Sequence, residues 1–323
     1  MTSSPGSVRR LRLLTATTVA SVWLLVIVGG VVRVTESGLG CPDWPLCTPS
    51  ALPLPNTESV IEYSHRVVVA WVTLLVATVA VFAWRRFRSR RDILWPALVA
   101  LALLPLQAVL GWAAIEFDLA GEMVSYHFML GMTFLAANAV TAAAAWRSVG
   151  ADGIPRPVGP PSAAFLWWAR IGAVVGLVTV SFGTAVMANG AAMACGQDWP
   201  LCNGGFADGG GLAALQVTHR MLAYTLATVA VILAVLAAKG SGPRPLGMVP
   251  AMVVFIQIGF GVWIVVAGDD YAVYAAASGA HVAGAGFLWG TLVLLAAVCE
   301  YAHRTAVRSE APVSAAGMRE PAA

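Results

Sequence analysis

Four histidines occupy matching positions in two similar stretches of the chain. His65 and His127 recur as His219 and His281, both at an offset of 154 residues, and all four lie in apolar segments. Imidazole is a common axial ligand of haem iron, and two imidazoles on neighbouring helices of a bundle can hold a haem from opposite faces. We therefore predict two bis-histidine haem sites, in preference to four unrelated structural histidines.

One charged residue near the histidines differs between the two stretches. Glu62 lies three residues before His65 and shares its helix face, whereas the matching position before His219 holds the neutral Gln216. A carboxylate in a membrane segment costs free energy, so we interpret Glu62 as a general acid/base or charge stabiliser. The N-terminal half would then do chemistry and the C-terminal half would carry electrons. The alternative is an interfacial ion pair between Glu62 and Arg66.

Arg66 and Arg220 directly follow the first histidine of each pair. Haem propionates are anions that an arginine can bind through charge-assisted hydrogen bonds, so both residues are candidate propionate contacts. The alternative is that each arginine snorkels to lipid headgroups. Glycines near the second histidine of each pair are predicted to let a porphyrin lie close to the helix backbone: Gly131, Gly279 and Gly284.

Two loops of similar sequence hold four of the five cysteines. The first cysteine loop is GCPDWPLC at 40–47, and the second is CGQDWPLC at 195–202. In an oxidising compartment we expect one disulfide in each loop, as a structural staple or as a redox-active dithiol. A zinc site is disfavoured because no histidine accompanies either pair at ligand spacing. The expected pairs are Cys41–Cys47 and Cys195–Cys202, and Cys299 is predicted to pack in the protein interior.

The composition indicates that a lipid bilayer surrounds most of the chain. Hydrophobic residues make up 59% of the 323 residues, charged residues make up 11%, and the mean hydropathy is +0.79. Such a chain cannot bury its apolar surface in one soluble core, so we predict an all-α integral membrane protein. Eight apolar runs are long enough to cross about 30 Å of hydrocarbon: 13–33, 62–84, 93–115, 124–146, 167–189, 214–238, 247–267 and 278–300.

Basic residues are distributed unevenly between these runs. They cluster before the first run and after the second, fourth, sixth and eighth runs. The positive-inside rule places both termini in the cytoplasm and both cysteine loops outside. The positive net charge is explained by these clusters, so no nucleic-acid partner is expected. His303, in the last basic cluster, is predicted to be solvated. The clusters are Arg9, Arg10 and Arg12; the five arginines from Arg85 to Arg91; Arg147 and Arg156; Lys239 and Arg244; and Arg304 and Arg308.

The repeat extends over most of the chain. Residues 61–66 match residues 215–220, and two further matched pairs, at an offset of 150, are Gln107 with Gln257 and Gly111 with Gly261. We therefore predict two four-helix bundles of parallel topology, related by a pseudo-two-fold axis along the membrane normal. The expected divisions are an N-terminal half at 1–149, a cytoplasmic linker at 150–162, a C-terminal half at 163–303 and a cytoplasmic tail at 304–323.

With these motifs, the chain resembles bacterial haem A synthase, which implies a plasma-membrane enzyme that converts haem O to haem A. The resemblance runs from Gly29 to about Cys299. It rests on ESGLGCPDWPLC at 36–47, EYSHR at 62–66, CGQDWPLCNG at 195–204 and QVTHR at 216–220, together with the histidines of the fourth and eighth runs.

The resemblance implies an oxidation of the C8 methyl group of haem O to a formyl group, through successive hydroxylations, which supplies haem A for cytochrome c oxidase. The expected partners are a haem O synthase, oxidase assembly factors and an electron donor. Further copies of the chain, in a homo-oligomer, are a candidate partner as well. By position, the implied roles are His65 and His127 for the substrate haem, His219 and His281 for a resident haem b, Glu62 as the catalytic carboxylate, and Cys41 with Cys47 as a loop pair associated with activity.

Two other classes of protein remain open at this stage. A dihaem b-type electron-transfer protein would relay electrons without modifying its haems. That design favours haems at different depths, whereas the four histidines share one depth near the outer ends of the even-numbered runs. A transporter built from repeats would use the histidines as a proton relay and would bind no haem.

Overall fold

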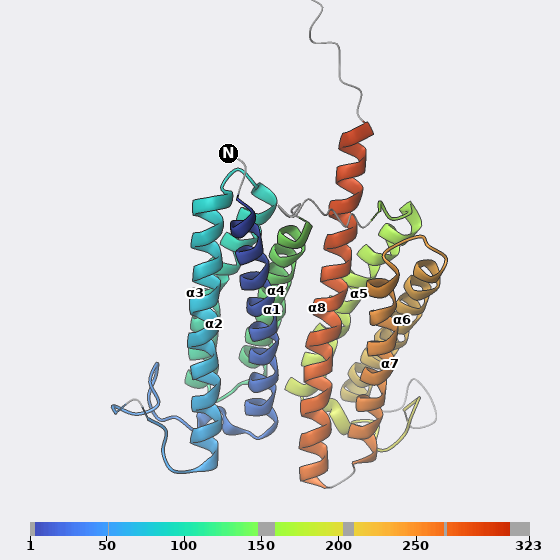
Figure 1. Ribbon diagram of the computed structural model, residues 1–323. Helices are drawn as coiled ribbons and strands as arrows, with labels where there is room; N and C mark the ends of the chain where they lie inside the picture. Colours follow the sequence, from blue (N-terminus) through green and yellow to red (C-terminus); the bar gives the residue numbers. More distant parts are fainter. Residues whose placement is uncertain (1–3, 51, 148–158, 203–209, 268–269, 311–323) are drawn as a thin grey trace, which may run out of the picture.

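The chain folds almost entirely into long helices (Figure 1). The computed structural model describes residues 4–50, 52–147, 159–202, 210–267 and 270–310. These residues contain no strand, and eight of their helices are long and apolar enough to span a membrane, which confirms the predicted all-α, eight-span fold. In chain order they are α1 (Pro5–Val34), α2 (Thr57–Phe87), α3 (Arg91–Glu116), α4 (Gly121–Arg147), α5 (Ala163–Ala188), α6 (Gly210–Ala238), α7 (Arg244–Val266) and α8 (Tyr271–Glu310). Two short 3-10 helices, η1 (Ser37–Leu39) and η2 (Ala191–Met193), follow α1 and α5.

Local sequence explains where α2 begins and ends. The side chain of Asn56 accepts a hydrogen bond from the backbone N–H of Ser59 at 2.8 Å, which satisfies one of the free donors at the helix start. Arg85 and Arg86 lie in the last turn, where cations favour the negative end of the helix dipole. The helix has 31 residues. At 1.5 Å per residue its length is roughly 45 Å, so its ends extend beyond the hydrocarbon.

The helices of each half contact one another in a ring. In the first half, α1 packs on α2, α2 on α3, α3 on α4, and α4 closes the ring on α1. The second half repeats this order from α5 to α8. Because each helix contacts the next one around its ring, α2 lies opposite α4 in the first half and α6 lies opposite α8 in the second half. The halves meet where α4 contacts α8, α1 contacts α8, and α4 contacts α5, so the outer helices α2, α3, α6 and α7 contribute little to this interface (Figure 1).

Two tryptophans connect the halves by hydrogen bonds. The indole N–H of Trp289 on α8 donates to the carbonyl oxygen of Met132 on α4 at 3.0 Å, and both residues are buried. The indole N–H of Trp23 on α1 donates to the carbonyl oxygen of Ala283 on α8 at 3.0 Å. A buried indole N–H needs a partner, and here the partner comes from the other half each time.

The two ends of the molecule carry different features. The N-terminus, the turn between α2 and α3, and the C-terminal end of α8 lie at one end, and both cysteine loops lie at the opposite end (Figure 1). The helix α8 is longer than the predicted run at 278–300, and its last turns project beyond the other helices (Figure 1). His303 lies on this projection and is partly exposed, whereas Cys299 is buried against Phe165 and Leu233, as predicted for a packing residue.

Some of the sequence predictions concern residues outside the described part of the chain. Arg156 and most of the predicted linker at 150–162 fall within 148–158, and most of the predicted tail at 304–323 falls within 311–323. The boundaries proposed for the two halves therefore stay predictions.

Candidate functional site

The four histidines lie at similar depth, one on each even-numbered helix. Each is six to ten residues after the first residue of its helix, at the end of the bundle that carries the cysteine loops. Because α2 lies opposite α4 and α6 opposite α8, the histidines of each half project from opposite corners of one ring. The sequence pairing of the four residues therefore corresponds to two pairs in space.

The second pair has the spacing that one iron requires. The ring centres of His219 and His281 are 6.3 Å apart, and the ring planes are inclined by 74°. Metal–imidazole nitrogen bonds are about 2 Å long, so an iron between two imidazoles would hold their ring centres roughly 6 Å apart. The structure brings this pair to a separation that suits bis-histidine ligation.

The Nδ1 atoms of the histidines have different partners. His219 Nδ1 lies 3.2 Å from the backbone oxygen of Thr179 on α5. A carbonyl oxygen can only accept a hydrogen bond, so Nδ1 carries the proton and Nε2 is left unprotonated, as a metal ligand would need to be. The side-chain amide of Gln107 on α3 lies 2.9 Å from His127 Nδ1. The Nδ1 atoms of His65 and His281 are buried without a hydrogen-bond partner.

Each histidine ring packs against a glycine of the preceding helix. In three of the four pairs an added β-carbon would lie 2.8 to 3.3 Å from the ring Cε1 and would press on the ring. In the fourth pair it would lie at 3.5 Å, an ordinary contact. The pairs are Gly29 with His65 at 3.2 Å, Gly111 with His127 at 3.3 Å, Gly183 with His219 at 2.8 Å, and Gly261 with His281 at 3.5 Å. Sequence reasoning did not identify this role, although the pairs recur at the offsets of the repeat.

Two of the three glycines that were expected to face a porphyrin lie against a glutamine of the neighbouring helix. A β-carbon on Gly131 would contact the amide of Gln107, and one on Gly284 would contact Gln257. A β-carbon on Gly279 would have nothing within 4 Å. Gly131 and Gly284 therefore make room for a glutamine of the neighbouring helix, and the Gln257 amide donates to the backbone oxygen of His281 at 2.7 Å.

Both cysteine loops are closed by disulfides. Cys41 is bonded to Cys47 and Cys195 to Cys202, as predicted, and all four cysteines are buried. The first disulfide lies against Ser59 of α2, and the second packs in a cluster with Ala213 and Val217 of α6.

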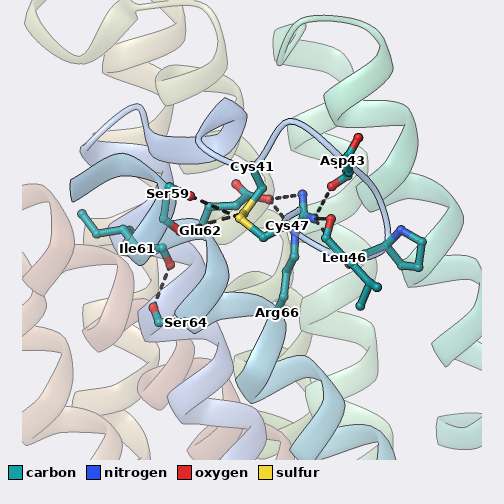
Figure 2. Close-up of polar contacts among 10 residues, drawn as sticks. Cys41, Asp43, Leu46, Cys47, Ser59, Ile61, Glu62, Ser64 and Arg66 are labelled. Carbon is teal, nitrogen blue, oxygen red and sulfur yellow. Dashed lines mark hydrogen bonds and ion pairs between the residues drawn. A yellow bond between two sulfur atoms is a disulfide. The ribbon is translucent and has the colours of Figure 1, made fainter. Parts of the chain in front are cut away.

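Arg66 links the first cysteine loop to Glu62 (Figure 2). Its Nε and Nη2 atoms donate to Glu62 Oε1 at 3.0 and 2.8 Å. Its Nη1 atom donates to the backbone oxygens of Asp43 at 2.6 Å, Leu46 at 2.7 Å and Pro45 at 3.3 Å. The ion pair of the alternative interpretation is thus present, and the loop contacts were not predicted.

Arg220 makes the same loop contacts without a carboxylate. Its Nη1 donates to the backbone oxygens of Asp198 at 2.8 Å, Leu201 at 3.1 Å and Pro200 at 3.4 Å. Gln216 instead donates to the backbone oxygen of Ala192 at 3.2 Å. Arg220 is only 7% exposed, and its Nη2 is buried without a partner. One strong donor is therefore available here, whereas the matching atom of Arg66 is used by Glu62.

A second polar difference lies beneath the loops. Ser59, which is fully buried, has its hydroxyl 3.2 Å from Cys47 Sγ and accepts a hydrogen bond from the backbone N–H of Leu54 at 2.9 Å. The residue 154 positions later is Ala213, which packs in an apolar cluster with Cys195 and Cys202. Sequence reasoning missed Ser59, and the offset of the repeat could have revealed it.

Comparison with known proteins agrees with this architecture. The profile of the COX15-CtaA family, described as cytochrome oxidase assembly protein, matches residues 12–293. A heme A synthase of Shouchella clausii is 30% identical over 218 residues, which cover 66% of this chain and 71% of that protein. One of Exiguobacterium sibiricum is 28% identical over 268 residues, covering 80% and 86%. One of Caulobacter vibrioides is 31% identical over 342 aligned positions, covering 88% and 93%.

Proposed function

This chain belongs to the COX15-CtaA family of cytochrome oxidase assembly proteins, and from that membership we propose that it oxidises the C8 methyl group of haem O to a formyl group. It is a multi-pass membrane oxidoreductase of haem A biosynthesis, as the relatives named heme A synthase indicate. These names favour a haem-modifying enzyme over a dihaem protein that only transfers electrons. The successive hydroxylations that lead to the formyl group are part of the proposal.

One observation supports this proposal above the others: the two halves share a plan and differ at their chemical residues. Both halves present a histidine pair, a glycine against each ring, and an arginine bonded to a cysteine loop. Only the first half adds the buried carboxylate of Glu62 and the hydroxyl of Ser59. An enzyme with one reacting haem and one resident haem requires such an unequal pair of sites.

We assign a resident haem b to the second half. His219 and His281 fit a single iron by their ring separation, and the carbonyl of Thr179 holds His219 in the ligating tautomer. Arg220 offers a buried guanidinium nitrogen without a partner, which suits a propionate carboxylate. A haem b bound there supplies one-electron transfer.

The substrate haem O belongs in the first half, held by His65 and His127. There Glu62 binds Nη2 of Arg66, the atom that Arg220 leaves open, and Nε as well, so Arg66 has less to offer a propionate. This difference suits a substrate that must enter and leave. Arg66 therefore takes a different part in the site, and the propionate contact is assigned to Arg220 alone.

In the proposed reaction Glu62 is the group that handles protons. Its carboxylate is 5% exposed, so little bulk water competes with it. It would accept a proton, or stabilise positive charge that develops, as the methyl group is oxidised. The histidine pair orients the substrate. The first cysteine loop, which is closed by a disulfide and lies at the end of the bundle opposite the N-terminus, is proposed to cover the site.

The proposed orientation in the membrane follows from the basic clusters. The end with the termini would face the cytoplasm and the cysteine loops would face the outside, where disulfides persist. The proposed partners are a haem O synthase, oxidase assembly factors and an electron donor.

The experiment that tests the function replaces Glu62 by Gln, the residue that the second half has at this position. The parent protein and Glu62→Gln are each produced in cells with and without a haem O synthase. The haems extracted from the purified proteins are then separated by chromatography. The parent should yield haem A only when haem O is supplied. Glu62→Gln should retain haem b, accumulate haem O and form about 10² to 10⁴ times less haem A, which is the usual contribution of a positioned acid/base group.

Two results would contradict the proposal. Haem A formation by Glu62→Gln at the parental rate would reduce the carboxylate to an ion-pair residue. A purified parent that contains only haem b, despite a supply of haem O, would favour the electron-transfer protein.

A further inference from the structure

We propose that Arg66 is a positioning residue, through which the disulfide-closed first cysteine loop fixes the carboxylate of Glu62. This inference rests on the proposed role of Glu62, and it gives the loop a part in catalysis beyond that of a cover. It predicts that opening the loop and altering Arg66 harm the reaction by the same route.

The guanidinium of Arg66 is shared between two groups. One edge, Nε and Nη2, holds Glu62 Oε1, and Nη1 reaches the loop carbonyls (Figure 2). Because the guanidinium is planar and rigid, the position of the loop carbonyls determines the direction of the edge that faces Glu62. A lysine ammonium is a point donor on a flexible chain and cannot reproduce this fork.

The loop is itself held firmly on α2. The disulfide joins residues six apart, Cys47 Sγ lies on the Ser59 hydroxyl, and both cysteines are buried. At Gly40 the loop backbone runs so close to Glu58 and Ser59 that a β-carbon would collide with their backbone atoms. The three carbonyls that Arg66 binds therefore form a fixed acceptor group.

In the second half the arginine contacts its loop but does not contact the residue that matches Glu62. Arg220 binds its loop through the corresponding three carbonyls, although Gln216 does not bind the arginine. The loop contact is therefore part of the common plan and does not depend on a carboxylate. In the first half an arginine held by its loop in the same way also binds a carboxylate.

Fixing Glu62 matters because its side chain has three rotatable bonds. Without a partner the carboxylate would sample several rotamers, and each would place its oxygens differently toward the substrate. A displacement of about 1 Å can cost a reaction about 10²-fold. Arg66 and the loop select one rotamer before the substrate arrives.

The principal test compares Arg66→Lys with the parent enzyme. We expect haem b content, its visible spectrum and the KM for haem O to be unchanged, and kcat for haem A formation to fall by about 10²-fold. A merely structural role would instead lower haem b content and protein yield. Ser64→Ala is the matched control, because Ser64 lies on the same turn of α2, is exposed, and bonds only to the backbone oxygen of Ile61. It should retain parental activity.

A double-mutant cycle tests the route through the loop. Replacing both Cys41 and Cys47 by Ser should lower kcat to a similar extent, and adding Arg66→Lys should cause little further loss, because both changes release the same carboxylate. Losses that multiply would show that loop and arginine act independently and would overturn the inference. Parental kcat in Arg66→Lys would overturn it as well.

The variant Glu62→Gln separates this inference from the proposed function. If Glu62→Gln loses haem A formation while Arg66→Lys does not, the carboxylate is catalytic and only the positioning role fails. If Glu62→Gln is fully active, the proposed function of the carboxylate fails first. In the Glu62→Gln background, Arg66→Lys should have no further effect on kcat.

Discussion

Gly183→Ala should displace the proposed haem ligand His219 through a single added methyl group. A β-carbon at Gly183 would lie 2.8 Å from Cε1 of His219, 3.3 Å from Nδ1 and 3.5 Å from Nε2. Carbon atoms in contact prefer about 3.5 to 4.0 Å, so the ring must retreat by about 0.7 Å or rotate. Either movement also weakens the contact of Nδ1 with the backbone oxygen of Thr179.

The expected size of the effect follows from the packing. Overfilling a well-packed site usually costs about 1 to 3 kcal/mol, which is about 5- to 150-fold in affinity at 1.4 kcal/mol for each factor of ten. The new alanine favours helix by about 1 kcal/mol over glycine, so α5 itself should not be weakened. Gly183→Ala should therefore fold and insert, and should bind haem b at least about fivefold more weakly.

The assay measures the amount of haem b per mole of purified protein and the visible absorption spectrum of the bound haem. Both are measured after the protein has been washed with increasing volumes of detergent buffer. Gly261→Ala is the matched control, because its β-carbon would lie 3.5 Å from Cε1 of His281, an ordinary contact within the same proposed haem site. Full haem b content in Gly183→Ala, or an equal loss in Gly261→Ala, would refute the reasoning that the glycines set the ring positions.

Three further outcomes are expected. Replacing His281 by Ala should lower low-spin haem b content and stop haem A formation, measured by absorption spectra and haem chromatography. A membrane-impermeant thiol reagent applied to intact cells should label Cys41 and Cys47 only after reduction, and should leave the buried Cys299 unlabelled; labelling of Cys41 without a reductant would contradict the disulfide or the orientation. Gln216→Glu should not create a second site of haem O oxidation, so in the Glu62→Gln background it should not restore haem A.

The sequence was sufficient for the fold because its signals are local. Apolar runs of sufficient length predict spanning helices wherever they occur, and the eight helices follow those runs. The predicted ends of the helices were less accurate. The helix α8 continues to Glu310, beyond the predicted limit at residue 300, because a helix does not stop where the hydropathy of its residues falls. The disulfides were predicted from the loop repeats and are present.

The contacts of Arg66 could not be read from the sequence. Its spacing of four residues from Glu62 does indicate an ion pair, and the pair is present. The acceptors in the loop, by contrast, are backbone oxygens 20 to 23 residues away, and every residue type carries such an oxygen. No side-chain pattern marks them.

The glycines show a related difficulty. Gly131 and Gly284 were chosen because they are close to a histidine along the same helix. A histidine ring packs against a neighbouring helix, whose residues are distant in sequence, so the glycines that contact the rings of His127 and His281 are Gly111 and Gly261.

The pattern of helix contacts has an evolutionary consequence. Exchanging the two halves replaces α1 by α5 and α4 by α8, and the reverse. The contact of α1 with α8 then becomes the contact of α5 with α4, which is also present. The contact of α4 with α8 becomes itself. A single four-helix chain pairing with an identical copy of itself through its first and fourth helices would produce the same set of contacts, as an isologous dimer does. A fused duplicate of such a gene keeps that dimer in one polypeptide, and it allows Ser59 and Glu62 to appear in one copy while Ala213 and Gln216 occupy the other. A dimer of identical subunits could never have separated the two roles in this way.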